Sequence, residues 1–559
     1  MNPEVAALTA KQPAGPNCPF PSDLGGKANP EADCREKSCS QRETLTGFSS
    51  FRDLHSAGPN SKTAAVLANS LKRYIPLAVW GVAVLTLLLI PAKIISYGYL
   101  PADDALRHAA KAVCGKPWSE ILVMRSDFPI DIHDGWHKVL GAIHHAFSAN
   151  AETLVIGSVV GLMILVNASI LAQLRRPEAW LASLLAGAVF VPELLFRLSL
   201  GRPYLFAIAV FITLLFIWSS PEREVPRPLG LISSVAMLAV ETWLHGAWYL
   251  MAFPALPLLL AKRFRGTLWY LCCWLGGSFL GACLTGHPWQ SLGQSLRLVS
   301  AMFGQHVLTR QLFGEFVPSN GNYAAVLVVA AVLLWRSRSP GWKAQELLHP
   351  IFLALIIGWI LGLKVNRFWL DWGLPAFLVW LALEFQKQLR LYLPPESWNR
   401  MLLTLGLAAA IFFQATADVN SRWTWNITNQ YLTQDNPDLA GWLPEPGGII
   451  YSADPNVFHQ TFFKNPNAPW RYALGFEPAL MLPENLEVKH KVDWNFGDLR
   501  PYEPWIRKMR PQDRLILRAS SSQLSGKPNI PELEWYYGIT DYWIGRLPRQ
   551  SNTGAQPAQ

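Results

Sequence analysis

The sequence has 559 residues, of which 51% are hydrophobic and only 16% are charged, and its formal net charge is +9. These proportions are unlike those of an ordinary soluble protein and indicate an integral membrane protein. The basic residues do not form a run interleaved with aromatic residues, so we do not expect a nucleic acid as a partner.

Residues 1–74 precede the first long apolar run. They are rich in Pro, Gly, Ser, Asn and Lys, a composition that favours disorder. They contain no short apolar core followed by a cleavage site, so we expect a disordered cytoplasmic tail and, after it, an uncleaved signal anchor that ends near Pro91. Of the seven cysteines, only Cys114 falls in a segment predicted to be exported, which argues against a disulfide framework.

Apolar blocks of about 15–22 residues, close to the length that crosses a bilayer, recur through residues 75–416. They predict a polytopic α-helical membrane domain with about eleven spans. The expected spans lie near residues 76–97, 152–172, 179–198, 203–219, 229–243, 247–261, 267–285, 323–335, 349–363, 373–385 and 401–416.

The short connectors between these spans alternate in charge. Basic clusters occupy every second connector, and short basic connectors stay in the cytoplasm. Examples are Arg175 with Arg176, Lys262 with Arg263, and Lys387 with Arg390. The exported side then receives a first loop, 99–151, a second loop, 286–322, and the C-terminal segment. We predict a cytoplasmic N-terminus and, for a bacterial chain, an inner (plasma) membrane protein with a periplasmic C-terminal domain.

Residues 417–559 differ from the apolar part in that Pro, Asn, Asp and Trp are abundant. Two short apolar runs, Gly448–Ser452 and Asp513–Arg518, are predicted to be buried strands. Helical turns are expected around 455–463 and 470–482. The segment therefore predicts a small exported α/β domain.

The first loop begins with an acidic pair, Asp103 and Asp104. One interpretation is purely structural: Asp103 caps the helix that follows Pro101, and Asp104 interacts favourably with the helix dipole. The alternative is that one carboxylate caps while the other takes a proton from an acceptor hydroxyl at the lipid surface. On a helix Asp104 shares a face with Arg107 and His108, and His108 becomes a candidate for the substrate cavity.

The same loop carries His133 and His137 at a spacing of i, i+4, which would place two imidazoles on one face of a helix. Together with Asp104 they could hold a divalent metal ion. The favoured interpretation is a polar face of an interfacial amphipathic helix, so no cofactor is assigned with certainty.

Further ionisable residues gather at the predicted exported ends of spans, where charge is costly to place. Glu193 and Arg197 are spaced to pair along one helix. Each cluster could be a local ion pair or an anchor, but together they suit a cavity for a phosphate-bearing lipid, with Arg367, Lys364 and Arg310 as phosphate ligands. The remaining candidates for the substrate cavity are Arg202, Glu241, His245, Glu315 and Glu193 itself.

This layout resembles the GT-C superfamily of polytopic glycosyltransferases. The resemblance rests on the acidic pair, the helices of the first loop, the second loop midway, the exported C-terminal domain and the stretch Arg367-Phe-Trp-Leu-Asp-Trp-Gly-Leu-Pro375, and it covers roughly residues 75–420. It implies a GT-C-like fold, a polyprenyl-phosphate or polyprenyl-diphosphate sugar as donor, Asp103 or Asp104 as base or metal ligand, and Arg367 as a contact of the donor phosphate.

Two departures from the family pattern narrow the expected reaction. The second loop has no Asp-x-Asp/Glu pair, and the C-terminal segment lacks the Trp-Trp-Asp signature of oligosaccharyltransferases. Both departures disfavour en bloc protein N-glycosylation and favour transfer of a single sugar to a surface glycan, lipid or protein acceptor, in polysaccharide biosynthesis of the cell envelope.

Two other classes of function stay open. An O-antigen polymerase or ligase would also have many spans and exported Arg and His residues, but would need neither the acidic pair nor the C-terminal domain. A membrane transporter would be expected to show internal repeats or broken helices with charges at the midplane of the membrane. Here the charges lie at span ends.

Overall fold

The computed structural model describes residues 71–304, 316–338, 342–427, 429–495, 497–519, 526–537 and 541–549. The chain divides into two units, Met1–Ala65 and Val66–Gln559, and all described residues belong to the second. The tail predicted for residues 1–74 therefore lies almost entirely outside the described residues.

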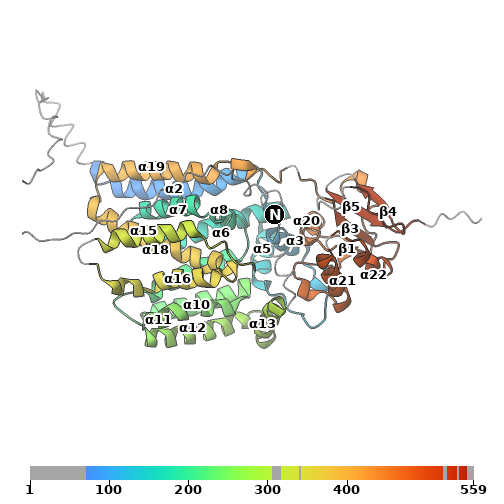
Figure 1. Ribbon diagram of the computed structural model, residues 1–559, viewed down its shortest axis with the longest axis horizontal. Helices are drawn as coiled ribbons and strands as arrows, with labels where there is room; N and C mark the ends of the chain where they lie inside the picture. Colours follow the sequence, from blue (N-terminus) through green and yellow to red (C-terminus); the bar gives the residue numbers. More distant parts are fainter. Residues whose placement is uncertain are drawn as a thin grey trace, which may run out of the picture. The chain divides into compact units, whose positions relative to one another are not determined.

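Residues 75–416 fold almost entirely into helices, shown in blue to orange in Figure 1. The helices α2 and α19 lie side by side although they are the first and last of this part. The α-helices are α2 (Ile75–Ser96), α3 (Asp104–Cys114), α4 (Trp118–Ile121), α5 (Asp134–Phe147), α6 (Ala151–Leu171), α7 (Pro177–Phe190), α8 (Glu193–Leu198), α9 (Tyr204–Trp218), α10 (Pro228–His245), α11 (Ala255–Leu260), α12 (Phe264–Cys283), α13 (Pro288–Gly304), α15 (Tyr323–Ser337), α16 (Pro350–Gly362), α17 (Asn366–Phe368), α18 (Leu374–Tyr392) and α19 (Trp398–Thr416).

Each predicted span falls on one or more helices, but the count of eleven spans is not confirmed. Among the described residues, four helical stretches are long and apolar enough to cross a membrane, and a pair bent by 108° makes a fifth if it counts as one span. The four are Ile75–Ser96, Ala151–Leu171, Pro228–His245 and Asn366–Tyr392, and the bent pair is Phe264–Cys283 with Pro288–Ala301. The chain is thus an integral membrane protein.

A helix break makes one helix shorter than its predicted span. The span expected near 179–198 ends as a helix at Phe190, and a second helix begins only at Glu193. Pro192 lies between them, and proline has no backbone N–H to continue the ladder of hydrogen bonds. The apolar run of the sequence thus continues across Pro192, whereas the helix is interrupted there.

The C-terminal part contains a mixed five-stranded sheet, in red in Figure 1, with the strand order β2-β1-β3-β5-β4. Strand β1 is parallel to β2 and β3, whereas β5 is antiparallel to β3 and β4. Its elements are β1 (Ile449–Tyr451), α20 (Pro455–Lys464), β2 (Arg471–Tyr472), α21 (Pro483–Trp494), α22 (Glu503–Ile506), β3 (Arg514–Arg518), β4 (Glu534–Tyr537) and β5 (Tyr542–Arg546). We call residues 417–549 the sheet domain.

The two strands predicted from apolar runs are confirmed as β1 and β3, and the helix expected around 455–463 is confirmed as α20. The helical turns expected around 470–482 are confirmed only at the end of that range. Residues Arg471 and Tyr472 instead pair with β1 as strand β2, because this pairing satisfies their backbone groups at the sheet edge. Only a short 3-10 turn, Pro478–Leu480, follows.

The first loop packs on the sheet domain. The backbone N–H of Val123 donates to the carbonyl of Tyr472 at 2.9 Å, so the loop extends the sheet beyond β2. Trp118 of the loop shares an apolar core with Phe458 and Phe462 of α20. The loop that carries the acidic pair and the sheet domain are therefore held together by both backbone pairing and apolar burial.

A buried ion cluster joins α7 to α19. Both side chains of the central pair, Glu178 and Arg400, are almost completely buried. Arg400 donates to Glu178 from Nε at 2.6 Å and from Nη2 at 3.1 Å. Arg176 donates to the same carboxylate at 3.3 Å. A carboxylate without exposure is stable in the charged form only with such partners.

Candidate active site

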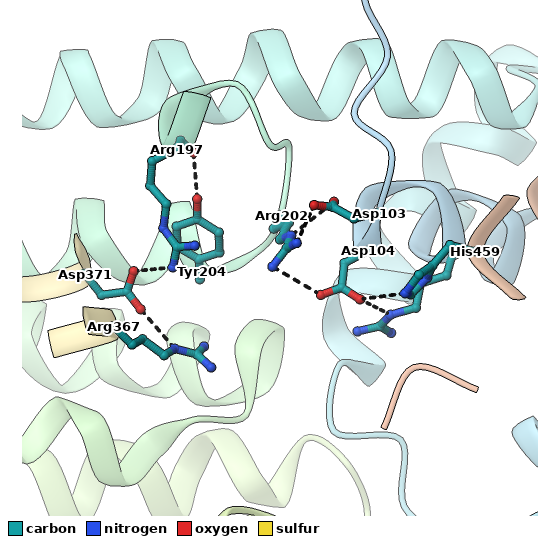
Figure 2. Close-up of polar contacts among 9 residues, drawn as sticks. Asp103, Asp104, Arg197, Arg202, Tyr204, Arg367, Asp371 and His459 are labelled. Carbon is teal, nitrogen blue, oxygen red and sulfur yellow. Dashed lines mark hydrogen bonds and ion pairs between the residues drawn. The ribbon is translucent and has the colours of Figure 1, made fainter. Parts of the chain in front are cut away.

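The side chain of Asp103 forms an ion pair with Arg202 and does not cap helix α3. It occupies the N-cap position of α3, but its carboxylate accepts no hydrogen bond from the helix backbone. Instead Arg202 donates from Nε to Oδ1 at 3.1 Å and from Nη2 to Oδ2, a bidentate pair (Figure 2). The predicted cap is wrong because two charge-assisted hydrogen bonds outweigh one bond to a backbone N–H.

Asp104 lies among three cationic or imidazole groups, as Figure 2 shows. Arg107 Nε donates to Oδ1 at 2.7 Å, which confirms that the two residues share a helix face. Arg202 Nη1 lies 3.5 Å from Oδ2, and His459 Nε2 lies 3.9 Å from Oδ1. Burial alone would raise the pKa of Asp104, but the charges of these neighbours together hold it well below its usual range.

Three separate elements bring these residues together. Asp103 and Asp104 begin α3, Arg202 lies in the turn between α8 and α9, and His459 is on α20 of the sheet domain. The turn requires Gly201: its φ is +63°, and a Cβ there would lie 2.9 Å from a methyl carbon of Val159. The side chains of Asp103 and Asp104 remain 23% and 27% exposed, so a ligand can reach them.

A second carboxylate cluster contains Asp371 and two arginines. Arg197 Nη2 donates to Asp371 at 2.5 Å, and Arg367 Nε donates to it at 3.1 Å (Figure 2). The predicted pairing of Arg197 with Glu193 is therefore replaced by a pair between two helices, and Glu193 is exposed. Asp371 is buried and belongs to one π-helical turn, Trp369–Gly373, that precedes α18.

Two histidines of the first loop, His108 and His137, form a hydrogen-bonded chain with Asp131. His137 Nδ1 lies 2.7 Å from Asp131, and His137 Nε2 lies 2.8 Å from His108 Nδ1. Both ring nitrogens of His137 are thus engaged, while His133 is the N-cap of α5 and its ring centroid lies 6.3 Å from that of His137. The predicted set of Asp104, His133 and His137 does not assemble.

The described residues also contain no other group of three or more His, Cys, Asp or Glu side chains arranged to hold a metal ion. The carboxylates of Asp103 and Asp104 do not fit a divalent ion either, because arginines already contact them. Burial is the largest influence on His108, His133 and His137 and lowers the pKa of each, with nearby Arg107 acting in the same direction.

His459 should make the stability of the protein depend on pH. Burial and the charges of Arg107 and Arg202 lower its pKa to about 4, while Asp104 and Asp103 oppose this shift. In the unfolded chain the ring takes up a proton near pH 6.5, so stability is lost as pH falls from there towards 4. We expect His459→Gln to flatten the pH dependence of the free energy of unfolding by up to about 1.4 kcal/mol per pH unit in this window.

Unfolding in detergent, followed between pH 7 and pH 4.5, measures this slope. The matched control is His145→Gln, since His145 is exposed and its replacement should leave the slope unchanged. An identical slope in wild type and His459→Gln would contradict the burial of a neutral imidazole at this position.

The remaining candidate residues from the sequence lie in different surroundings. Glu241 and His245 do pair along α10, at 3.2 Å, and line a small cavity together with Tyr204 and Asp371. Lys364 is exposed. Arg310 and Glu315 lie outside the described residues.

Sequence reasoning missed Asp371 and His459 as members of the site and gave Arg197 the wrong partner. The spacing of Arg367 and Asp371, i, i+4, was a usable signal for the second cluster. No local signal marks His459, because its contact with Asp104 joins two distant parts of the chain.

The geometry combines accessible carboxylates with arginines on the same patch. An ionised carboxylate can receive a proton, and guanidinium groups bind phosphate oxygens through paired N–H donors. The arrangement suits two ligands side by side: one that carries a phosphate and one that supplies a nucleophilic hydroxyl group.

No family model matches the chain, and no curated protein matches it. Among solved structures it is similar to the oligosaccharyltransferase of Archaeoglobus fulgidus tethered to an acceptor peptide with an NVT sequon, at 14% identity and a TM-score of 0.42, covering 80% of this chain and 70% of that one. The apo form of the same enzyme matches at 13% identity and a TM-score of 0.41, with the same coverage. The similarity by itself assigns no reaction to this chain. The solved structures that resemble it thus include an enzyme of the GT-C superfamily.

Proposed function

We propose that this protein is a membrane glycosyltransferase that moves a sugar from a polyprenyl-(di)phosphate donor to a glycan, lipid or protein acceptor on the exported face. One observation carries the proposal: the accessible carboxylates of Asp103 and Asp104 lie beside Arg202 and Arg107, directly after the first membrane helix. A lipid-borne phosphate reaches that position from the membrane, and an acceptor reaches it from the aqueous side.

In this proposal Asp104 takes the proton of the acceptor hydroxyl as that oxygen attacks the anomeric carbon of the donor sugar. The bond from this carbon to the phosphate oxygen breaks, and the polyprenyl-(di)phosphate leaves. The arginines beside Asp104 make it a weak base in the structure, since they lower its pKa. A donor phosphate that binds Arg202 would neutralise part of this charge and raise the pKa of the carboxyl. The base then becomes effective only when donor is present.

Arg367 is proposed as a further contact of the donor phosphate, with Lys364 and Arg310 as supporting cations. Its side chain is 30% exposed and is oriented by the bond from its Nε to Asp371. Arg367→Lys keeps the charge but loses the planar fork, so we expect transfer at low donor concentration to fall by about tenfold while saturating donor restores most of it.

Initial rates across a donor series measure this effect, with Arg500→Lys as the control, which makes the same substitution at an exposed arginine of the sheet domain. A wild-type rate for Arg367→Lys at the lowest donor concentration would remove Arg367 from the donor site.

The proposed topology places the N-terminus in the cytoplasm and the sheet domain outside, in a bacterial inner membrane. It keeps the predicted division into a tail (1–74), a membrane domain (75–416) and an exported domain (417–559). Because short basic connectors stay in the cytoplasm, reporter fusions after Arg390 and after Asp454 should report opposite compartments. Cytoplasmic signals from both fusions would contradict the topology and, with it, the exported active site.

Mass spectrometry of surface glycans and lipid-linked sugars tests the reaction itself. In cells without the gene we expect one sugar to disappear from a surface glycan, lipid or protein and its lipid-linked donor to accumulate. Wild-type protein should reverse both changes and Asp104→Asn should reverse neither. Unchanged glycans together with unchanged donor levels would contradict glycosyl transfer.

A further inference from the structure

The acidic pair lacks what a divalent cation requires. Such an ion binds oxygen lone pairs that converge on one point, usually with a surplus of negative charge around it. Here two carboxylates, Asp103 and Asp104, are matched by two guanidinium groups, those of Arg202 and Arg107. The charges of the cluster therefore sum to zero before any ion binds.

The contacts of the individual oxygens lead to the same conclusion. Oδ1 of Asp103 accepts from Arg202 Nε at 3.1 Å, and Oδ2 accepts from Nη2 of the same guanidinium. Oδ1 of Asp104 accepts from Arg107 Nε at 2.7 Å, and Oδ2 lies 3.5 Å from Arg202 Nη1. Each carboxylate oxygen thus faces a guanidinium nitrogen, and a metal ion would have to displace a cation from its own ligands.

A contact outside the cluster positions Arg107, and a backbone turn positions Arg202. Arg107 is 3% exposed, and its guanidinium lies over the ring of Phe476 in the sheet domain, 4.0 Å from the centroid. Arg202 follows Gly201, whose backbone conformation and close approach to Val159 fix the turn.

From these contacts we infer that the acidic pair works without a divalent cation and that Arg202 and Arg107 take the position and the charge of such an ion. As catalysts these guanidiniums would bind the donor phosphate through paired N–H groups, the task that a metal ion performs elsewhere. The catalytic part of this inference rests on the proposed function, whereas the statement about metal binding does not.

A titration with Mn²⁺ tests the statement about metal binding and does not require an active enzyme. Full-length protein is purified, stripped with EDTA and titrated with Mn²⁺ at neutral pH, and free Mn²⁺ is followed by electron paramagnetic resonance. We expect no saturable site with a Kd below about 1 mM, the weak end of protein sites for such hard cations. Saturable binding that disappears in the Asp103→Asn/Asp104→Asn variant would overturn the inference.

Arg202→Met serves as the positive comparison, because it removes one of the two cations and leaves the carboxylates with a net negative charge. Binding of Mn²⁺ to this variant and not to wild type would support the role of the guanidinium as the built-in counter-ion. Its thermal unfolding midpoint, measured beside that of wild type, verifies that the variant is folded.

The rate of sugar transfer tests the catalytic part of the inference. We expect EDTA-treated wild type to transfer sugar at an unchanged rate, whereas a loss that Mg²⁺ or Mn²⁺ restores would overturn the inference. If the protein transfers no sugar with or without cations, the proposed function fails, and the Mn²⁺ titration still decides whether the acidic pair binds a metal ion.

Discussion

Replacing Asp104 by Asn is expected to lower the rate of sugar transfer by about 10²–10⁴-fold, the usual cost of removing a general base. The amide keeps the shape of the side chain but cannot take the proton of the acceptor. Because the buried guanidinium of Arg107 loses its counter-charge in this variant, the thermal unfolding midpoint should fall as well, so the rates are compared at a temperature at which both proteins are folded. Rates measured with purified protein and saturating donor check the prediction.

Asp103→Asn is the matched variant, because it changes the neighbouring carboxylate in the same way. From the local sequence, Asn would be expected to keep most activity, since it caps a helix nearly as well as Asp. The bidentate bond from Arg202 changes that expectation. Losing one hydrogen bond to a charged group should cost roughly 10- to 100-fold in rate. Full activity of the double Asn variant at normal protein levels would exclude the acidic pair from the mechanism.

Glu178→Gln is expected to lower the free energy of unfolding by about 3–5 kcal/mol, because it leaves the guanidinium of Arg400 buried without its counter-charge. Glu178 has no exposed surface, and Arg400 is only 3% exposed. Unfolding in detergent, followed by temperature or denaturant, measures the loss. Glu396→Gln is a suitable control because Glu396 is exposed and close to Arg400 in sequence.

The double variant Glu178→Leu/Arg400→Leu separates the loss of the ion pair from the loss of packing. Replacing both members of a buried pair by apolar residues is often neutral or stabilising, so the double variant should regain part of the stability that Glu178→Gln loses. The remaining loss is that of buried Arg176, which still lacks its counter-charge. Unfolding of Glu178→Gln at the wild-type temperature would contradict the burial of this pair.

The sequence alone predicted those features that depend on neighbours along the chain. Apolar runs indicated the membrane helices and the two strands β1 and β3, since burial of apolar side chains follows directly from local composition. The pairs Asp104–Arg107 and Glu241–His245 followed from helical spacing. The length of individual membrane helices did not follow, because a proline interrupts a helix without interrupting the apolar run.

Only the tertiary structure decided which charges meet. A helix rule assigned Asp103 to a cap and Arg197 to Glu193, yet each charge found a stronger partner from another element, in Arg202 and in Asp371. Buried charges are stable only when paired, so a distant partner of opposite sign displaces a weak local one. His459 belongs to the site because apolar residues of the first loop pack against α20, and this packing places the imidazole near Asp104. No spacing of residues in the sequence predicts that contact.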